Sequence, residues 1–297
     1  MKPALFEYFA PEKIDDAVEL LARHGEDGKI LAGGQSLMPL MNLRLARPQV
    51  VIDINRVTAL DYISQGADGV LAIGALTRQR SLEHSAVVKD HNPVLAATMP
   101  LIGHFQIRNR GTIGGSLVHA DPAAELPAVS IALGAEFVVK GERGERVISA
   151  EKFFLGSMTT AIEPTELLTE IRFPRWRPGS GWAVEEVARR RGDFAIVGAV
   201  VWLQLNGTGL CEETRIAVFG VEDRPVRTVR GEQILLGNRP EPDIFAEVAE
   251  VVAEQLDPVS DVHASREYRK EVGACLTRRA LQTASGRVGK VGKGMGP

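Results

Sequence analysis

The spacing of apolar residues in the first third of the chain predicts helices mixed with short buried strands. Between residues 14 and 24, apolar side chains recur every three or four positions, which predicts an amphipathic helix that Gly25 ends. Continuous apolar runs predict strands at 29–32, 50–54 and 70–74. A helix over 36–43 follows the first strand, so the glycine pair between them forms a strand-to-helix turn.

The same patterns continue to the end of the chain and predict an α+β protein. One helix is expected around 94–104. A second is expected over 123–133, with Asp121 as its N-cap and Pro122 as its first helical residue. Prolines and glycines at 172–181 predict a domain boundary. Beyond it we expect an antiparallel pair of strands covered by helices. The expected strands are 199–205 and 214–220, joined by a turn at 206–209, and the expected helices are 242–256 and 265–284. We therefore expect domains at 1–176, itself divided near 55–60, and at 177–285, and a flexible tail at 286–297.

Composition narrows the classes of function. The net charge of −3 over 297 residues leaves no global basic field for nucleic acid. The two cysteines, Cys211 and Cys275, are too few for a zinc ribbon or a four-cysteine cluster, so no metal site is expected. We interpret both as buried or half-buried thiols in a reducing cytoplasm. No apolar run is long enough for a signal peptide or a membrane span.

Two glycine turns carry the most specific chemistry. Each pairs adjacent glycines with a nearby serine, in Gly33-Gly34-Gln35-Ser36 and Gly114-Gly115-Ser116. Glycine allows backbone N–H groups to approach a phosphate closely, and serine adds a hydroxyl donor. Two such turns, about eighty residues apart, suggest a dinucleotide whose diphosphate is held from two sides, although each alone also fits a tight surface turn. The glycine patterns of Rossmann and Walker sites are absent from the sequence.

Three strings around these turns resemble the flavin-binding medium subunit of the molybdenum hydroxylases, the group that includes carbon monoxide dehydrogenase and the flavin domain of xanthine dehydrogenase. They are residues 32–37, residues 106–125 with QIRNRGTIGGS and HADPAAE, and residues 189–195 with RRRGDFA. The resemblance covers nearly the whole chain in order. It implies FAD in a two-part domain of the vanillyl-alcohol oxidase type, followed by a small α/β C-terminal domain with an antiparallel sheet.

The resemblance also implies which residues bind the cofactor. Those in the two turns are Ala32, Gly33, Gly34, Gln35, Ser36 and Leu37, facing Thr112, Ile113, Gly114, Gly115 and Ser116. Glu125 matches an acidic residue that bonds the adenosine ribose, and Leu168 an apolar residue near the adenine. Ile102 stands where some relatives have an aromatic residue, and Phe194 matches a position beside the isoalloxazine, although it also fits a core phenylalanine. Where the family often has a lysine, this chain has Glu185 and Glu186.

The remaining polar groups suggest no catalytic residue in this chain. His119, which flanks the second turn, is interpreted as bonding to backbone beside the cofactor, because an electron relay needs no general base. The run Arg108-Asn109-Arg110 is interpreted as a partner contact. Residues 189–191 are three arginines that read first as a solvated face, with docking as the alternative.

The resemblance implies that the chain is an electron-transfer subunit. The resemblance implies a partner with a molybdenum cofactor, a partner with [2Fe–2S] clusters, and a dimer of heterotrimers. FAD in this chain would accept electrons from the [2Fe–2S] partner and pass them to an external acceptor. A stand-alone FAD oxidase or dehydrogenase and an inactive FAD-binding scaffold remain as alternatives.

Overall fold

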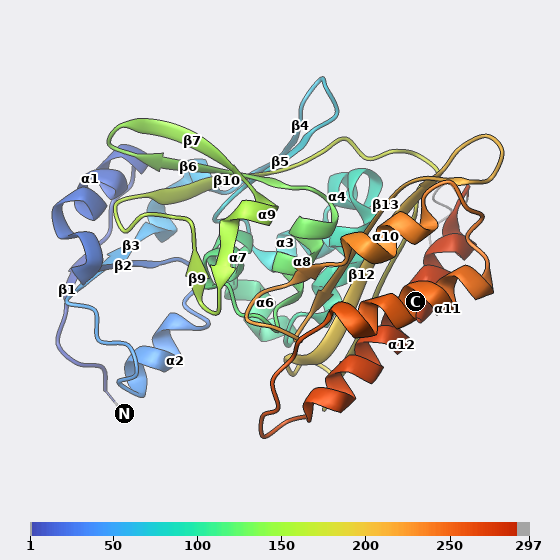
Figure 1. The fold of residues 1–297 in the computed structure, drawn as a ribbon. Helices are drawn as coiled ribbons and strands as arrows, with labels where there is room; N and C mark the ends of the chain where they lie inside the picture. Colours follow the sequence, from blue (N-terminus) through green and yellow to red (C-terminus); the bar gives the residue numbers. More distant parts are fainter. Residues whose placement is uncertain (1, 290–297) are drawn as a thin grey trace.

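The computed structural model describes residues 2–289 of the protein (Figure 1). Its N-terminal part is a parallel sheet in the order β1-β3-β2, with α1 packed against it. Ala17, Val18 and Leu21 are the buried face of α1, as their helical spacing predicts. The elements are β1 (Glu7–Phe9), α1 (Ile14–His24), β2 (Gly28–Leu31), α2 (Leu37–Asn42) and β3 (Val50–Asp53), with 3-10 turns at Gly25–Asp27, Ile54–Arg56 and Thr58–Leu60.

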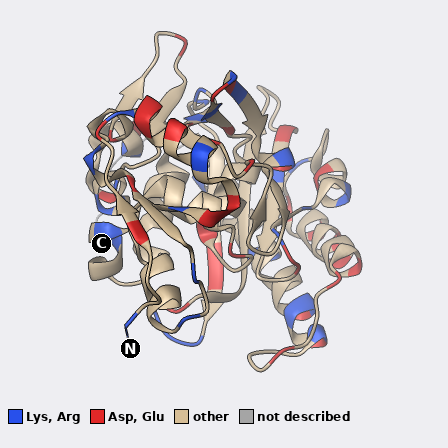
Figure 2. Cartoon of the chain, turned by 90° about the vertical axis from the view of Figure 1, so that its left-hand side faces the viewer, with Lys and Arg blue, Asp and Glu red and all other residues tan. Residues whose placement is uncertain are grey.

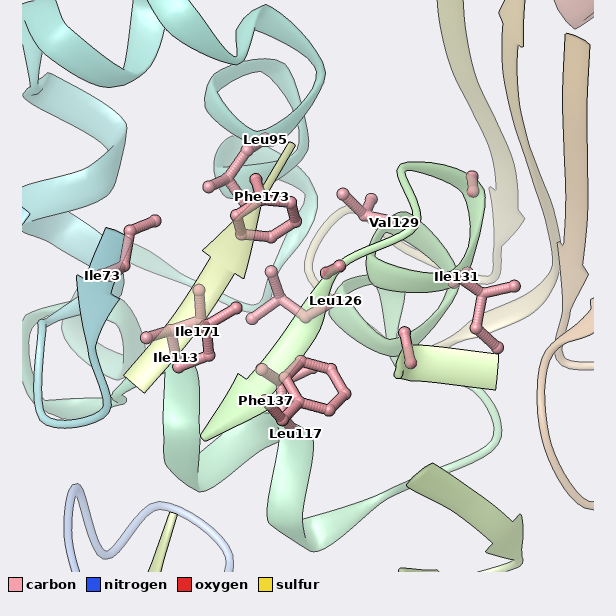
Figure 3. Packing of buried hydrophobic residues seen from close by; sticks show 14 of the residues in the cluster. Ile73, Leu95, Ile113, Leu117, Leu126, Val129, Ile131, Phe137, Ile171 and Phe173 are labelled. Carbon is pink, nitrogen blue, oxygen red and sulfur yellow. The ribbon is translucent and has the colours of Figure 1, made fainter. Parts of the chain in front are cut away.

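The central part is an antiparallel sheet in the order β4-β5-β10-β6-β7. Its strands are β4 (Ile63–Gln65), β5 (Leu71–Gly74), β6 (Glu136–Gly141), β7 (Gly144–Ser149) and β10 (Leu167–Phe173). The remaining elements are α3 (Gln79–His84), α4 (Ala86–His91), α5 (Pro93–Thr98), η4 (Met99–Leu101), α6 (Phe105–Arg110), α7 (Ile113–His119), α8 (Glu125–Ala132), α9 (Ala150–Phe153), β8 (Phe154–Gly156) and β9 (Thr159–Thr160). Figure 3 shows side chains from α5, α7, α8 and from β5, β6 and β10 meeting in one apolar cluster. This core fixes α7, which carries the second glycine turn.

The C-terminal part is an antiparallel sheet in the order β11-β12-β13-β14, with α11 and α12 on the outer face (Figure 1). Alternate residues of β12 point to opposite faces: Val200 joins the central core, whereas Ala199 and Val201 pack with the helices. The C-terminal part therefore packs against the central part through a shared apolar core. Its elements are β11 (Gly181–Ala188), β12 (Ala195–Leu205), β13 (Cys211–Phe219), β14 (Val226–Arg227), α10 (Val229–Leu235), α11 (Pro242–Gln255) and α12 (Arg266–Arg287).

The predicted α+β class is confirmed, but two helix boundaries are wrong. The helix expected around 94–104 stops as α5 and a 3-10 turn, because Pro100 has no N–H to continue an α-helix. The helix expected from residue 123 begins at Glu125. Asp121 still acts locally, since its side chain accepts from the N–H of Ala123 at 2.9 Å.

The tail prediction is also wrong for residues 286–289. Helix α12 continues to Arg287, whose guanidinium lies 4.0 Å from the centre of the Trp182 ring and donates to the Trp182 carbonyl at 2.8 Å. Gly289 then donates to the carbonyl of Gly179. Docking on β11 therefore orders this segment, and residues 290–297 lie outside the described part of the chain.

The surface is mixed in charge and the two thiols differ in environment. Figure 2 shows basic and acidic segments interspersed on the side that faces the viewer. Cys211 is buried, and burial raises its pKa to about 11, but Cys275 is exposed, so the prediction of a buried or half-buried thiol is wrong there. Within residues 2–289, no helix combines the length and apolar character needed to cross a membrane.

Candidate functional site

The fold brings the two glycine turns into direct contact. A Cβ on Gly33 would lie 2.4 Å from the carbonyl oxygen of Arg110 and 2.9 Å from the Cα of Gly111. Only glycine permits this approach of the first turn to the peptide that leads into the second. Across the same gap, a Cβ on Gly115 would lie 3.8 Å from the Cβ of Ala32. Segments far apart in sequence thus form two walls of one site.

The first turn presents a row of backbone donors. It connects β2 to α2, and Gly34 adopts a φ of 72°, in the left-handed region. The N–H groups of Gly33, Gly34, Gln35 and Ser36 have no acceptor within residues 2–289. Consecutive free N–H groups form a cradle for an anion, because each carries a partial positive charge that would otherwise need solvent.

The second turn uses its backbone donors internally. The N–H groups of Ile113 and Gly114 donate to the carbonyls of Thr77 and Ala75 at 3.1 and 3.0 Å. Gly115 donates to the Thr112 hydroxyl at 3.0 Å, which caps α7. The half-buried Ser116 remains as a hydroxyl donor on this wall. The two walls therefore offer an anion different groups, main-chain N–H on one side and side-chain hydroxyl on the other.

Gly114 has a different role from that expected of a residue in open contact with a diphosphate. A Cβ there would lie 2.6 Å from the Ala75 carbonyl oxygen and 2.7 Å from the Ala75 Cβ. The missing side chain therefore makes room for the loop after β5, inside the protein. The direction of this Cβ could not be read from a Gly-Gly string, because it depends on the neighbouring loop.

Two buried carboxyl groups lie near enough to influence each other where the domains meet. Glu125, at the start of α8, is only 4% exposed, and burial, reinforced by the charges of Glu186 and Asp121, raises its pKa to about 8. Burial likewise raises the pKa of Glu186 on β11 to about 7, and its Oε2 has no partner among the described residues. The adjacent Glu185 points to the opposite face, where it pairs with Arg279 at 3.4 Å. Strand alternation thus assigns only Glu186 to the site side.

The other expected binding residues lie in the core or at its edge, with one exception. Ile102, Ile113 and Leu168 are at most 9% exposed and belong to the central apolar cluster, while Leu37 is half-buried. Ile113 therefore faces the site only with its main chain. Phe194 is 61% exposed, so the interpretation as a core phenylalanine is wrong. Its ring is free to stack on a planar group or a partner.

The prediction that Arg108 contacts a partner is wrong. Its side chain is buried and bonds Glu83 through Nε at 2.9 Å and the Ile102 carbonyl through Nη1 at 2.9 Å, so it is internal. Arg110 and residues 189–191 are exposed, as a solvated face requires. His119 is half-buried, desolvation lowers its pKa, and within residues 2–289 it makes no hydrogen bond to backbone, contrary to expectation.

Two residues that the sequence did not single out together link the two walls. Asn55 donates to the Ala32 carbonyl at 2.8 Å, and Arg78 bonds both the Asn55 side chain and the Arg110 carbonyl. Both follow buried strands, β3 and β5, closely in the chain. Their position just after buried strands could have marked both as candidate site residues. That they bond to each other could be seen only in the folded structure.

Comparison with known proteins shows which family the chain matches. Residues 4–176 match the FAD binding domain in molybdopterin dehydrogenase, and residues 182–284 match the CO dehydrogenase flavoprotein C-terminal domain. The chain is 42% identical over 284 residues to the 6-hydroxypseudooxynicotine dehydrogenase complex subunit alpha of Paenarthrobacter nicotinovorans, covering 96% of each chain. It is 40% identical to the caffeine dehydrogenase subunit beta of a Pseudomonas species, covering 97% of each.

A solved structure agrees with the sequence relatives. The fold superposes on a chain of carbon monoxide dehydrogenase from Hydrogenophaga pseudoflava with a TM-score of 0.94 and 38% identity, covering 97% of this chain and 100% of the other. The predicted family and the FAD cofactor are thereby confirmed, and the cradle of free N–H groups suits an anionic dinucleotide. The chain is a FAD-binding oxidoreductase subunit of the molybdenum hydroxylase family.

Proposed function

We propose that this chain relays electrons from a [2Fe–2S] partner subunit to an external acceptor, and that substrate is hydroxylated on a separate molybdenum-containing subunit. The contact between the two glycine turns carries the proposal, because it brings a row of main-chain N–H groups, unpaired within residues 2–289, beside a second turn, as binding of a dinucleotide diphosphate requires. When bound, FAD supplies the capacity to accept single electrons and to deliver two. The protein supplies binding, orientation and electrostatic surroundings.

The binding roles are proposed as follows. The free N–H groups of residues 33–36 hold the diphosphate from one side, and the Ser116 hydroxyl contacts it from the other. Backbone donors stabilise the phosphate charge without requiring a lysine. Glu125 accepts a hydrogen bond from the adenosine ribose, Leu168 lies by the adenine and Ile102 beside the cofactor. Phe194 packs against the isoalloxazine with its exposed ring.

A mixed apolar and basic surface beside the cradle is the proposed docking face for the [2Fe–2S] partner. Phe105 and Ile107 on α6 are 56% and 36% exposed. The loop before Phe194 joins them, since a Cβ on Gly192 would lie 2.6 Å from the His104 ring. Residues 189–191 and Arg110 are exposed and make no ion pair within residues 2–289, so the face suits an acidic partner.

A reduction experiment tests the relay. The FAD-loaded chain is mixed anaerobically with the reduced [2Fe–2S] subunit of its own complex, and loss of oxidised-flavin absorbance is followed by stopped flow. We expect rapid bleaching that requires the partner. Bleaching by a small substrate without any partner would instead favour a stand-alone oxidase, and absence of bleaching in both mixtures would contradict electron transfer by this chain.

We also propose an assembly and a location. The complex is a dimer of heterotrimers, by analogy with the family it belongs to, and native mass spectrometry of the purified complex measures the stoichiometry. It resides in the cytoplasm, which suits two free cysteines, one of them exposed. Cell fractionation with antibody detection tests the location, and recovery outside the cytoplasmic fraction would contradict it.

A further inference from the structure

We infer that Arg78 is a positioning residue that clamps the two walls of the FAD cradle together and sets the gap between them. The inference rests on the proposed diphosphate site. The two side chains that form the clamp, Arg78 and Asn55, lie outside both glycine-containing sequence strings, so those strings do not predict their hydrogen bonds.

One arm of the clamp reaches the first wall. Nη2 of Arg78 donates to Oδ1 of Asn55 at 2.6 Å, and Nδ2 of Asn55 donates to the Ala32 carbonyl at 2.8 Å. Ala32 directly precedes the glycine pair of the first turn. Arg78 therefore acts on this turn through a single side chain.

The other arm reaches the second wall. Nη1 of Arg78 donates to the carbonyl of Arg110. This same carbonyl is the group that a Cβ on Gly33 would strike at 2.4 Å. A planar guanidinium with donors in a fixed fork is suited to hold two acceptors at a defined separation. One residue thus determines how closely the first turn approaches the second.

A partly exposed network of hydrogen bonds fixes the middle of the clamp. Oδ1 of Asp53 accepts from the N–H of Asn55 at 2.9 Å and from its Nδ2 at 2.6 Å, and Oδ2 accepts from the Tyr8 hydroxyl at 2.7 Å. Asn55 therefore has its amide oxygen directed at Arg78 and its amide nitrogen at Asp53 and Ala32. The orientation of the amide is determined by partners on both sides.

The positive charges of Arg78 and Arg110 also favour binding of an anion beside the clamp. Desolvation, followed by repulsion from Arg110, lowers the pKa of Arg78. Two arginines that repel each other beside a row of free N–H groups are stabilised when a diphosphate is bound nearby. The clamp is therefore expected to contribute more to cofactor binding than to folding. The second wall also stays attached to the loop after β5 without the Arg78 side chain, through Gln79 N–H to the Gly111 carbonyl at 2.9 Å and Ile113 N–H to the Thr77 carbonyl at 3.1 Å.

The test compares FAD affinity in full-length chains that carry Arg78→Met, Arg78→Lys or the matched control Arg80→Met. Arg80 lies two residues further on, and within residues 2–289 its one ion pair is with the partly exposed Glu83, at 3.1 Å. Affinity is measured by flavin fluorescence on titration of the stripped protein, and folding by urea unfolding without FAD. We expect Arg78→Met to weaken FAD binding by about 10- to 100-fold, because two hydrogen bonds to a charged donor are lost. Arg80→Met should stay within about twofold of wild type.

Three results would overturn the clamp. The first is wild-type affinity in Arg78→Lys, because charge alone would then suffice without the fork. The second is a lower unfolding midpoint in Arg78→Met with unchanged FAD affinity, which would make Arg78 merely structural. The third is additivity of Asn55→Ala with Arg78→Met, because residues of one clamp should give losses that are less than additive. Failure of wild type itself to bind FAD would refute the proposed function instead.

Discussion

The two buried carboxyl groups at the domain junction predict a pH dependence of stability, and one substitution should remove the part that comes from Glu186. Burial raises the pKa of Glu186 from its ordinary 4.5 to about 7 in the folded protein. Between these two pH values the folded state keeps a proton that the unfolded chain has released. Stability therefore falls as pH rises from about 4.5 to about 7, and stays constant above that range as far as this group is concerned.

The size of the effect follows from the pKa change. Such a change corresponds to at most about 3 kcal/mol, because each tenfold preference is worth about 1.4 kcal/mol. Solvent reaches part of the Glu186 side chain, which reduces the expected loss to about 1 to 2 kcal/mol. Glu186→Gln, neutral at every pH, should match wild type at pH 5 and exceed its stability by this amount at pH 8. It should also relieve Glu125, whose pKa is raised further by the charge of Glu186.

Urea unfolding of the FAD-free protein, measured at intervals between pH 5 and pH 8, reports the free energy of unfolding. Glu185→Gln is the matched control, because the adjacent side chain lies on the other face of β11 and pairs with Arg279. The control should keep the slope of the wild type. A Glu186→Gln variant that lost stability with pH as steeply as wild type would refute the assignment of the buried carboxyl.

Three further substitutions probe the packing around the site. Gly114→Ala should destabilise the fold by about 1 to 3 kcal/mol in urea, because its Cβ would meet the Ala75 backbone; unchanged stability would show that α7 is not held against that loop. Arg108→Met should cost about 3 kcal/mol by leaving the Glu83 carboxylate without its buried partner, whereas a loss below about 1 kcal/mol, as expected of an exposed ion pair, would contradict the geometry. Phe194→Ala should change the unfolding free energy by less than about 0.5 kcal/mol, because the ring is exposed, and a larger loss would mean that the ring is packed in the free chain.

Local patterns predicted the elements with a strong apolar pattern, because such a pattern depends only on neighbours in sequence, but they missed β6, β7, β10 and β11. The α1 helix and the strands β3 and β5 lie within a residue or so of their expected limits, and the glycine pair of the first turn does join a strand to a helix. The errors have local causes too. Pro100 interrupts a helical pattern that its apolar neighbours continue, and Asp121 closes a turn ahead of α8 in place of capping the helix.

The sequence alone determined the α+β class and the two turns that suggest a diphosphate, because glycine spacing and apolar periodicity depend only on the order of residues along the chain. The FAD family followed from the resemblance of three sequence strings to known flavin-binding subunits. The tertiary structure alone decided which groups of each turn stay available. Among residues 2–289, it left the N–H groups of residues 33–36 without an acceptor but gave acceptors to those of 113–116. It also directed the position of a Cβ at Gly114 toward Ala75, and placed Glu186 near enough to raise the pKa of Glu125. It also placed Arg78 across both walls. Such details depend on contacts between segments far apart in sequence, and no local pattern specifies which acceptor a folded chain brings to a given donor.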